Sequence, residues 1–213
     1  MKQIWVLALT AVMMLSCSIT AHAGSVYLDY ALNNSVENSW AGNPNPTSSG
    51  FLVGVEAPID NWKIAFDYFS GQDKQNTAKI CDDAYYTVKG GYALINNHQT
   101  RIDLTLGYYD RTFDNLMGSN GEAYSYLIGL DTLFNVTPRS AFGFDFGYGI
   151  SGKDKYNAVQ YDLKPMLLYI LRYNYFFAEN LGFDIAYRGV QLTDKANNKA
   201  NTTGFSAGIL YRF

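Results

Sequence analysis

The chain has 213 residues, of which 48% are hydrophobic and 16% aromatic, and its formal net charge at pH 7 is −3. A nucleic-acid-binding protein usually carries a surplus of clustered Lys and Arg, so this mildly acidic balance excludes that class of partner.

The first residues have the pattern of a secretory signal peptide. Lys2 precedes an apolar stretch over residues 4–15, and the small-residue site Ala21-His22-Ala23 follows. We therefore predict a signal peptide over residues 1–23, cleaved after Ala23, and one domain over residues 24–213.

Two alternatives exist for this amino-terminal segment. An uncleaved anchor helix is one, although the apolar stretch is short compared with the roughly 20 residues that span a bilayer. A lipoprotein processed before Cys17 is the other, but the preceding residues fit that recognition pattern poorly. Cleavage after Ala23 would leave Cys81 as the single cysteine, so the domain would have no internal disulfide.

Beyond residue 23 no run of 18 apolar residues predicts a transmembrane helix, whereas alternation of apolar and polar residues predicts strands. Most of these strands are close to the nine to eleven residues that a tilted membrane strand needs, and their even number suits a single-chain bacterial barrel. We expect a transmembrane antiparallel up-and-down β-barrel, with eight strands as the alternative to ten. The predicted strands cover residues 25–32, 50–57, 62–70, 84–94, 100–109, 123–134, 140–150, 162–175, 181–188 and 203–213.

The connections alternate between short and long. Outer-membrane barrels have tight periplasmic turns and longer outside loops, so we expect the long segments to be extracellular and both termini to be periplasmic. The short segments are 58–61, 95–99, 135–139 and 176–180, and the long ones are 33–49, 71–83, 110–121, 151–161 and 189–201.

One face of each predicted strand could contact lipid, because it is apolar and uncharged. In residues 142–150, for example, this face consists of Phe142, Phe144, Phe146, Tyr148 and Ile150. Aromatic residues recur near both ends of the strands, as expected at the two membrane interfaces. A soluble sandwich or lipocalin-like barrel is the alternative, but it has no need of two aromatic rims.

The opposite face carries charges of both signs. Paired charges of this kind would interlock as a salt-bridge network that fills the lumen. The alternative is a water path that selects ions or small polar solutes. Met166, Leu168 and Ile170 also point inward and predict a locally dry wall. The predicted lumen charges are Asp29, Glu56, Lys63, Asp67, Lys89, Arg101, Asp103, Asp131, Asp145, Lys164, Arg172, Asp184, Arg188 and Arg212.

The final strand carries the most specific motif. Phe205, Ile209, Tyr211 and Phe213 share one face, and the chain ends on Phe213. This pattern resembles the closing strand of bacterial outer-membrane β-barrels, and the resemblance implies that these residues are recognised by the barrel-assembly machinery. In its overall pattern the chain resembles small outer-membrane barrels of the opacity and invasion type, which usually have eight strands. No site residue is carried over from that group.

The sequence offers little for catalysis. Barrel enzymes of similar size use histidine with carboxylate or serine partners, but His98 lies in a predicted periplasmic turn. Cys81 has no nearby base, and Asp82-Asp83 alone provides too few oxygens for calcium. We expect no catalytic residue, no metal site and no cofactor.

These observations predict an integral outer-membrane barrel with a structural or surface-interaction role, and a narrow porin-like channel is the alternative. The expected partners are outer-membrane lipid, the barrel-assembly machinery and an extracellular ligand at the loops, without nucleic acid.

Overall fold

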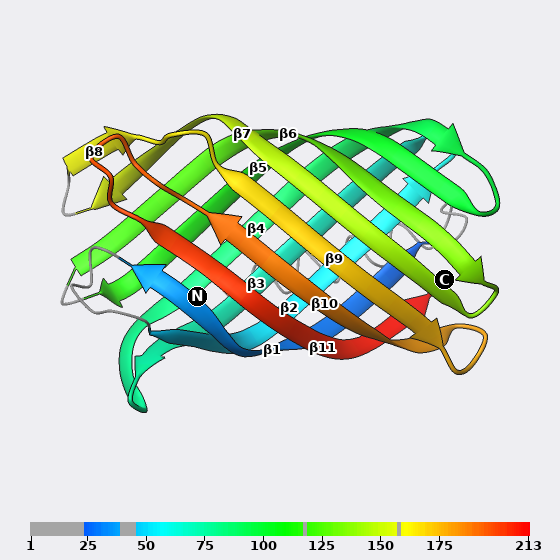
Figure 1. Ribbon diagram of the computed structural model, residues 1–213, viewed down its shortest axis with the longest axis horizontal. Helices are drawn as coiled ribbons and strands as arrows, with labels where there is room; N and C mark the ends of the chain where they lie inside the picture. The colour runs from blue at the N-terminus through cyan, green and yellow to red at the C-terminus, as the bar shows by residue number, and fades with distance from the viewer. Residues whose placement is uncertain (1–23, 39–45, 117–118, 157–158) are drawn as a thin grey trace.

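The computed structural model describes residues 24–38, 46–116, 119–156 and 159–213 (Figure 1). The predicted signal peptide, residues 1–23, lies outside this part of the chain. The described residues form strands and no helix long and apolar enough to cross a membrane. The strands are β1 (Ser25–Asn38), β2 (Thr47–Ile59), β3 (Trp62–Gln75), β4 (Ala78–Asn96), β5 (Thr100–Leu116), β6 (Ser119–Thr137), β7 (Ser140–Tyr156), β8 (Val159–Asp162), β9 (Leu167–Phe176), β10 (Leu181–Gln191) and β11 (Ala200–Arg212).

Ten of these strands close into an antiparallel barrel, which confirms the predicted fold (Figure 1). Each strand pairs with its neighbours along the chain, apart from β8, which pairs only with β7 and leaves β7 to pair with β9 in the wall. The first and last strands complete the ring, with Val26 opposite Tyr211 and Leu32 opposite Phe205. No strand of the barrel wall therefore has an unpaired edge, which a sheet in a membrane requires.

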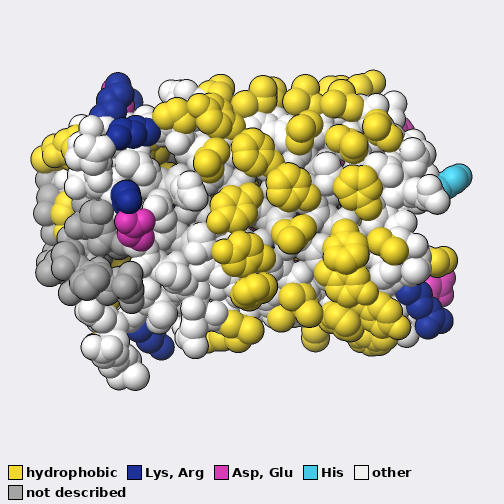
Figure 2. All heavy atoms as spheres, viewed as in Figure 1, with side chains coloured by type: hydrophobic (Ala, Val, Ile, Leu, Met, Phe, Trp, Pro, Cys, Tyr) yellow, Lys and Arg dark blue, Asp and Glu magenta, His cyan; other side chains and the backbone are white. Residues whose placement is uncertain are grey.

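Burial alternates along the strands as the sequence pattern predicts. In β7 the side chains from Phe142 to Tyr148 are exposed at even positions and buried at odd positions. Figure 2 shows, on the face in view, the apolar side chains gathered in a broad band across the barrel. Val55 and Ala57 belong to the same outer face but are buried, because the larger Phe66 and Ile64 lie opposite them on β3. An apolar outer face is what a lipid environment needs.

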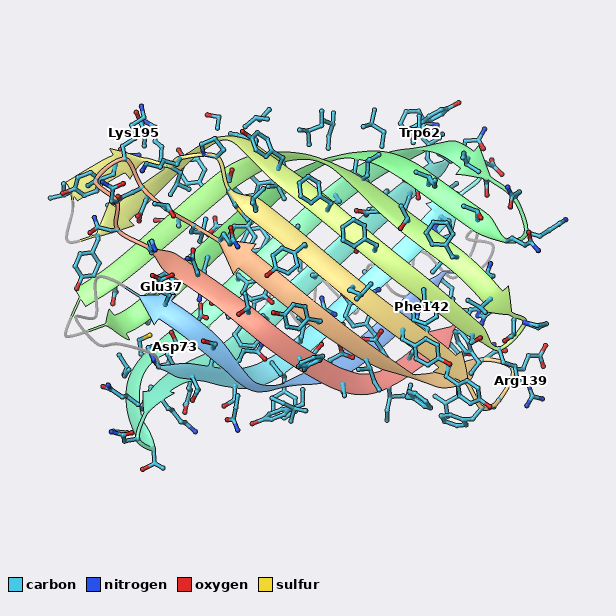
Figure 3. The ribbon with its side chains drawn as sticks, in the orientation of Figure 1. Glu37, Trp62, Asp73, Arg139, Phe142 and Lys195 are labelled. Carbon is cyan, nitrogen blue, oxygen red and sulfur yellow. The ribbon has the colours of Figure 1, made fainter. Side chains whose placement is uncertain are left out.

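Aromatic pairs lie towards both margins of this band. At the margin near the short turns, the Trp62 and Tyr92 ring centroids are 5.0 Å apart. At the other margin the Tyr187 and Phe205 centroids are also 5.0 Å apart. Trp62 points outward near the end that carries Arg139 (Figure 3). The two margins have the aromatic character of membrane interfaces.

The two ends of the barrel differ in their connections. At one end the chain turns at residues 60–61, 97–99, 138–139 and 177–180, inside the predicted short segments. At the other end the described parts of the predicted long segments 33–49, 71–83, 110–121 and 151–161 are mostly strand, whereas residues 192–199 lie outside the strands. β3 and β4 meet in a turn of only Asn76 and Thr77, both with positive φ. The strands continue beyond the apolar band, where the outer surface of the barrel is polar (Figure 2). A strand with a polar outer face is stable there because that face contacts water.

The predicted strand over 162–175 is interrupted in the structure. β8 ends at Asp162 and β9 begins at Leu167, and between them Pro165 has no N–H to donate to a ladder. Lys164, predicted to face the lumen, is exposed, whereas its neighbour Leu163 is buried. The prediction for Lys164 is wrong because the alternation does not continue across this break.

Candidate functional site in the lumen

The half of the lumen next to the short turns is lined by ion pairs between strands. Lys63 Nζ of β3 lies 2.9 Å from Asp131 Oδ2 of β6, and Lys89 Nζ of β4 lies 2.8 Å from the same oxygen. Lys89 also lies 3.5 Å from Asp145 of β7. These side chains are almost fully buried. The two lysines therefore link four strands of the barrel, β3, β4, β6 and β7, from inside.

Arginines extend this network. Arg172 Nη1 of β9 donates to Glu56 Oε1 of β2 at 2.8 Å, and three other wall strands separate β9 from β2, so this pair crosses the lumen. Arg172 Nε also lies 3.4 Å from Asp184. Arg101 Nε contacts both oxygens of Asp103, at 3.0 and 2.9 Å. Each of these acidic groups has a basic partner, as buried charges require.

A further group links β10, β11 and β1. Arg188 Nη2 lies 3.2 Å from Asp29 Oδ2, and the Ser206 hydroxyl donates to the same oxygen at 3.0 Å. Tyr27 lies beside this group, and its hydroxyl donates to Asp67 of β3. The Tyr27 ring fits because Gly54 has no side chain, since a Cβ there would lie 2.1 Å from the ring.

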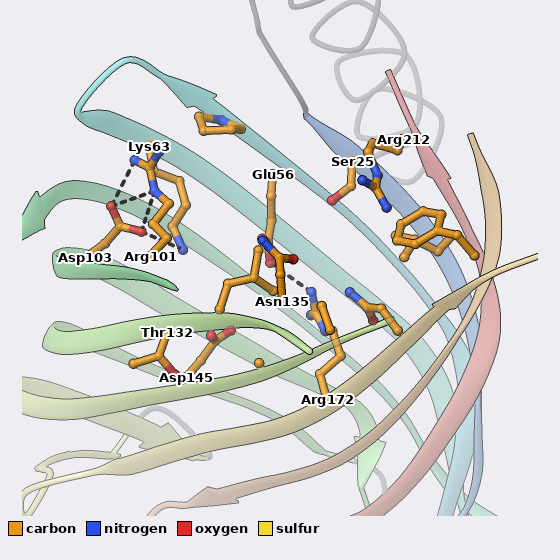
Figure 4. A pocket seen from close by; sticks show the side chains of 17 residues that line it. Ser25, Glu56, Lys63, Arg101, Asp103, Thr132, Asn135, Asp145, Arg172 and Arg212 are labelled. Carbon is orange, nitrogen blue, oxygen red and sulfur yellow. Dashed lines mark hydrogen bonds and ion pairs between the residues drawn. The ribbon is translucent and has the colours of Figure 1, made fainter. Parts of the chain in front are cut away.

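A cavity of about 180 Å³ lies within this charged half (Figure 4). Its walls come from the ends of strands near the short turns, such as Pro58, Asn135 and Phe176, so it opens towards that end of the barrel. Arg172 extends across it towards Glu56 (Figure 4). The ionic residues that line it are Glu56, Lys63, Arg101, Asp103, Asp145, Arg172 and Arg212.

The other half of the lumen is apolar. Met166, Leu168 and Ile170 point inward, as their alternation predicts, and they are at most 5% exposed. They join an inward-facing cluster that fills this half. Its other buried members are Cys81, Tyr109, Phe113, Ala123, Leu127, Leu163, Ala186, Val190, Leu192 and Ala200.

One arginine crosses this apolar half. Arg111 of β5 donates to both oxygens of Asp83, at 2.9 and 2.8 Å. The same guanidinium donates to the Ala200 carbonyl at 3.0 Å and to the Thr202 hydroxyl at 2.7 Å, both on β11. β5 and β11 lie on opposite sides of the ring, so Arg111 joins the two sides. Arg111 is not among the predicted lumen charges, because residues 110–121 have the composition of a loop.

Titratable groups beyond the apolar band are perturbed by burial. Burial and the neighbouring Asp83 raise the pKa of Asp73 to about 6. Burial and Asp194 raise the pKa of Asp154 to about 7, and neither oxygen of Asp154 has a hydrogen-bond partner. Burial also raises the pKa of the Cys81 thiol, whose Sγ lies 3.6 Å from Asp73. A thiol held in its neutral form is a poor nucleophile.

The remaining predicted residues take varied positions. Lys164 does not join the lumen network, because it is exposed and donates to Asn197. Arg212 lines the cavity, and its guanidinium carbon lies 3.6 Å above the Phe176 ring. Phe205, Ile209 and Tyr211 are exposed on the outer face of β11, and Phe213 follows the strand and donates its N–H to the Gly24 carbonyl.

Among the groups considered for chemistry, His98 lies at the opposite end of the barrel from Cys81, Asp82 and Asp83. His98 is exposed in the turn between β4 and β5. Asp82 pairs with Lys79 on the surface, whereas Asp83 is held by Arg111. Within the described ranges no group of three or more His, Cys, Asp or Glu side chains could hold a metal ion.

The architecture is shared with solved membrane barrels. The chain aligns with the outer-membrane protease OmpT from Escherichia coli over 91% of its own length and 98% of that chain, with a TM-score of 0.58 and 11% identity. The fold is that of a bacterial outer-membrane β-barrel. The chain also aligns with the attachment invasion locus protein Ail of Yersinia pestis, over 90% of this chain and 98% of that one, with a TM-score of 0.45 and 14% identity. A third alignment is with an outer-membrane channel from Pseudomonas putida F1, over 92% of this chain and 96% of that one, with a TM-score of 0.49 and 10% identity.

No protein-family model matches the sequence, and no curated protein matches it. At identities this low the structural likeness establishes the fold and leaves the activity to be inferred from the lumen itself.

Proposed function

We propose that the protein is an integral outer-membrane barrel with a closed lumen, and that its role is structural or involves surface interaction rather than catalysis. The observation that carries this proposal is the apolar cluster around Tyr109, Phe113 and Met166, which occupies the lumen opposite the charged half. Ions do not cross a dry, close-packed segment, because nothing there replaces their hydration. The ion pairs of the charged half then link the strands of the barrel from inside.

The surface role is supported by the extra length of the strands. β4 and β6 each have 19 residues, although about nine to eleven suffice to cross a membrane. The excess lies at the end with the long hairpins, whose outer surface is polar (Figure 2). In our proposal this end faces outward and offers the surface for an extracellular ligand, while the short turns and both ends of the domain face the periplasm. The exposed face of β11 would be the part that the assembly machinery recognises.

The experiment for the closed lumen is a conductance measurement. We expect purified, refolded protein in a planar bilayer to show no steady unitary current. Steady openings would overturn the closed lumen and support a narrow channel. This channel is the second candidate function, and the cavity beside Arg101 and Arg172 favours it. A matched pair of variants sharpens the test. Phe113→Ala should admit current if this side chain seals the lumen, whereas Phe146→Ala on the outer face should not.

The surface role needs a separate measurement, because a closed barrel could be purely structural. Shortening the β3–β4 hairpin by removing residues 74–79 and joining its strands with a two-residue turn should leave the barrel folded. Under our proposal, cells carrying this variant lose adhesion to host cells or matrix relative to the full-length protein. Equal adhesion by both forms, at equal surface amounts, would leave only the structural role.

A further inference from the structure

The ionic side chains that line the cavity in the charged half differ in whether they have a partner of opposite charge. Four of these are basic and three are acidic. Each of the acidic groups already has a basic partner, because Glu56 pairs with Arg172, Asp103 with Arg101, and Asp145 with Lys89. The cavity therefore presents no free carboxylate to a cation.

Arg212 has no such partner. It forms no ion pair with any residue in the described part of the chain, and its guanidinium only stacks on Phe176, at 3.6 Å. Stacking covers one face of the group and leaves its N–H donors available in the plane. A planar guanidinium with free donors is suited to bind a carboxylate or a phosphate in a bidentate manner.

Arg172 provides a second positive charge on the wall of the same cavity. It is 6% exposed, and its Nη2 has no hydrogen-bond partner, although Nη1 contacts Glu56 and Nε lies near Asp184. Nη2 has almost no accessible surface, so an anion in the cavity does not contact it directly, and Arg172 contributes its positive charge to the wall.

We propose that this cavity binds a small soluble oxyanion, with a carboxylate or phosphate group held by the guanidinium of Arg212 and attracted by the charge of Arg172 on the same cavity wall. The volume of about 180 Å³ is larger than a few water molecules need and accommodates an ion such as acetate or phosphate. The ligand enters from the end with the short turns, where the cavity opens. This site adds ligand binding to the structural role proposed above, because it makes the end of the lumen near the short turns a binding pocket.

The test is a titration of the refolded protein in a non-ionic detergent, with sodium phosphate and separately sodium acetate, at ionic strength held constant with chloride. The observable is the chemical shift of the arginine side-chain Nε–Hε resonances. We expect saturable shifts of Arg212 and Arg172 with at least one of the two anions. Shifts that rise linearly without saturation, or that chloride alone reproduces, would overturn the proposal.

Three variants sharpen the result. Arg212→Gln removes the free guanidinium and should weaken binding at least about tenfold, since a charge-assisted contact is lost. Arg139→Gln removes an exposed charge from a turn at the same end and should leave binding unchanged (Figure 3). Equal weakening by both variants would show only a general electrostatic effect and would refute the site.

Gly143→Val tests the cavity without altering charge. Gly143 lines the cavity, and a Cβ there would meet only Thr132 O at 3.4 Å and Arg172 Cβ at 3.7 Å, so the strand tolerates it. We expect the branched side chain to occupy the space and abolish binding while the barrel stays folded. Full binding by this variant would place the anion elsewhere.

A last arm separates a soluble ligand from a lipid headgroup that carries the same phosphate chemistry. The titration is repeated in micelles containing phosphatidylglycerol and no added phosphate. Saturation by free phosphate in the lipid-free detergent supports the proposal. Shifts of Arg212 that arise only with the anionic lipid would overturn it in favour of a lipid-binding site. Conductance is a separate readout, so failure of the closed lumen and failure of this site are distinguishable.

Discussion

In the half of the lumen next to the short turns, basic and acidic side chains bridge strands around a cavity. In the half within the long hairpins, apolar side chains form a packed cluster that contains a few buried ionic groups, among them Arg111, Asp83 and Asp154. Buried ion pairs contribute little net stability, because desolvation offsets their attraction. Burial of a large apolar side chain contributes about 1.5–3 kcal/mol. The comparison indicates that the apolar half supplies stability and the seal, while the charged half keeps space open.

The largest expected effect is at the ionic group inside the apolar half. Arg111→Met should lower the free energy of unfolding by about 3–5 kcal/mol, because it leaves Asp83 buried without a partner. Urea unfolding in lipid vesicles, followed by tryptophan fluorescence, measures this change. The double variant Arg111→Met/Asp83→Leu should recover much of the loss. A loss below about 1 kcal/mol in the single variant would show that the two halves do not differ as described.

A smaller effect separates the inside of the wall from the outside. Leu168→Ala should cost about 2–5 kcal/mol, because Leu168 is buried in the apolar cluster and its truncation leaves a cavity. Leu171→Ala, on the outer face of the same strand, should cost less, since lipid fills the space. The same unfolding assay compares the two variants. Equal costs would mean that the lumen in this half is not close-packed.

The pH dependence provides a third test. The pKa of Asp154 is raised to about 7 by burial and by Asp194, so the folded state holds a proton that the unfolded state has already lost. The free energy of unfolding should therefore fall by about 1–3 kcal/mol as the pH rises from about 4 to about 7. Asp154→Asn should remove this slope and stabilise the protein at pH 8.

Hydrogen exchange of the Leu163 and Asp194 amides, measured across that pH range, locates the effect, because these residues form a bridge next to Asp154 on β7. Asp162→Asn is the matched control, since Asp162 is exposed and paired with Lys195. If the slope persists in Asp154→Asn, another buried group such as Asp73 is responsible.

The smallest effect is expected at Lys164. It is exposed and outside the charged network, so Lys164→Ala should change the free energy of unfolding by less than about 0.5 kcal/mol. Lys89→Met, by contrast, leaves Asp131 and Asp145 short of a partner and should cost several times more. Unfolding of both variants under the same conditions decides whether Lys164 belongs with the lumen charges.

Much of this architecture follows from alternation where the two faces of a strand meet different surroundings. Between Phe142 and Tyr148 one face contacts lipid and the other the lumen, so the pattern is sharp and the orientation is predictable. Beyond the apolar band both faces of a strand can be polar. The segment around Asp73 and Cys81 therefore has the composition of a loop, although its inward side chains are fully buried.

The sequence predicts which side chains of a strand face the lumen better than it predicts which of those side chains pair with one another. Alternation places Glu56 and Arg172 inside, but their contact depends on the curvature that brings β2 and β9 face to face. Arg212 has the right face for the network, yet the absence of an ion pair at this position is visible only in three dimensions. The prediction for Lys164 is wrong for a simpler reason, because Pro165 ends the regular strand pairing that the alternation requires.

The seam between β1 and β11 joins residues that are almost the whole domain apart in sequence, as the pairing of Ser25 with Arg212 shows. Such a long-range closure has a high entropic cost before any contact offsets it, which slows folding. Until the last dozen residues are in place, both borders of the curled sheet are open to pairing with other chains. A truncation before Ala200 should therefore yield a product that aggregates instead of a smaller barrel.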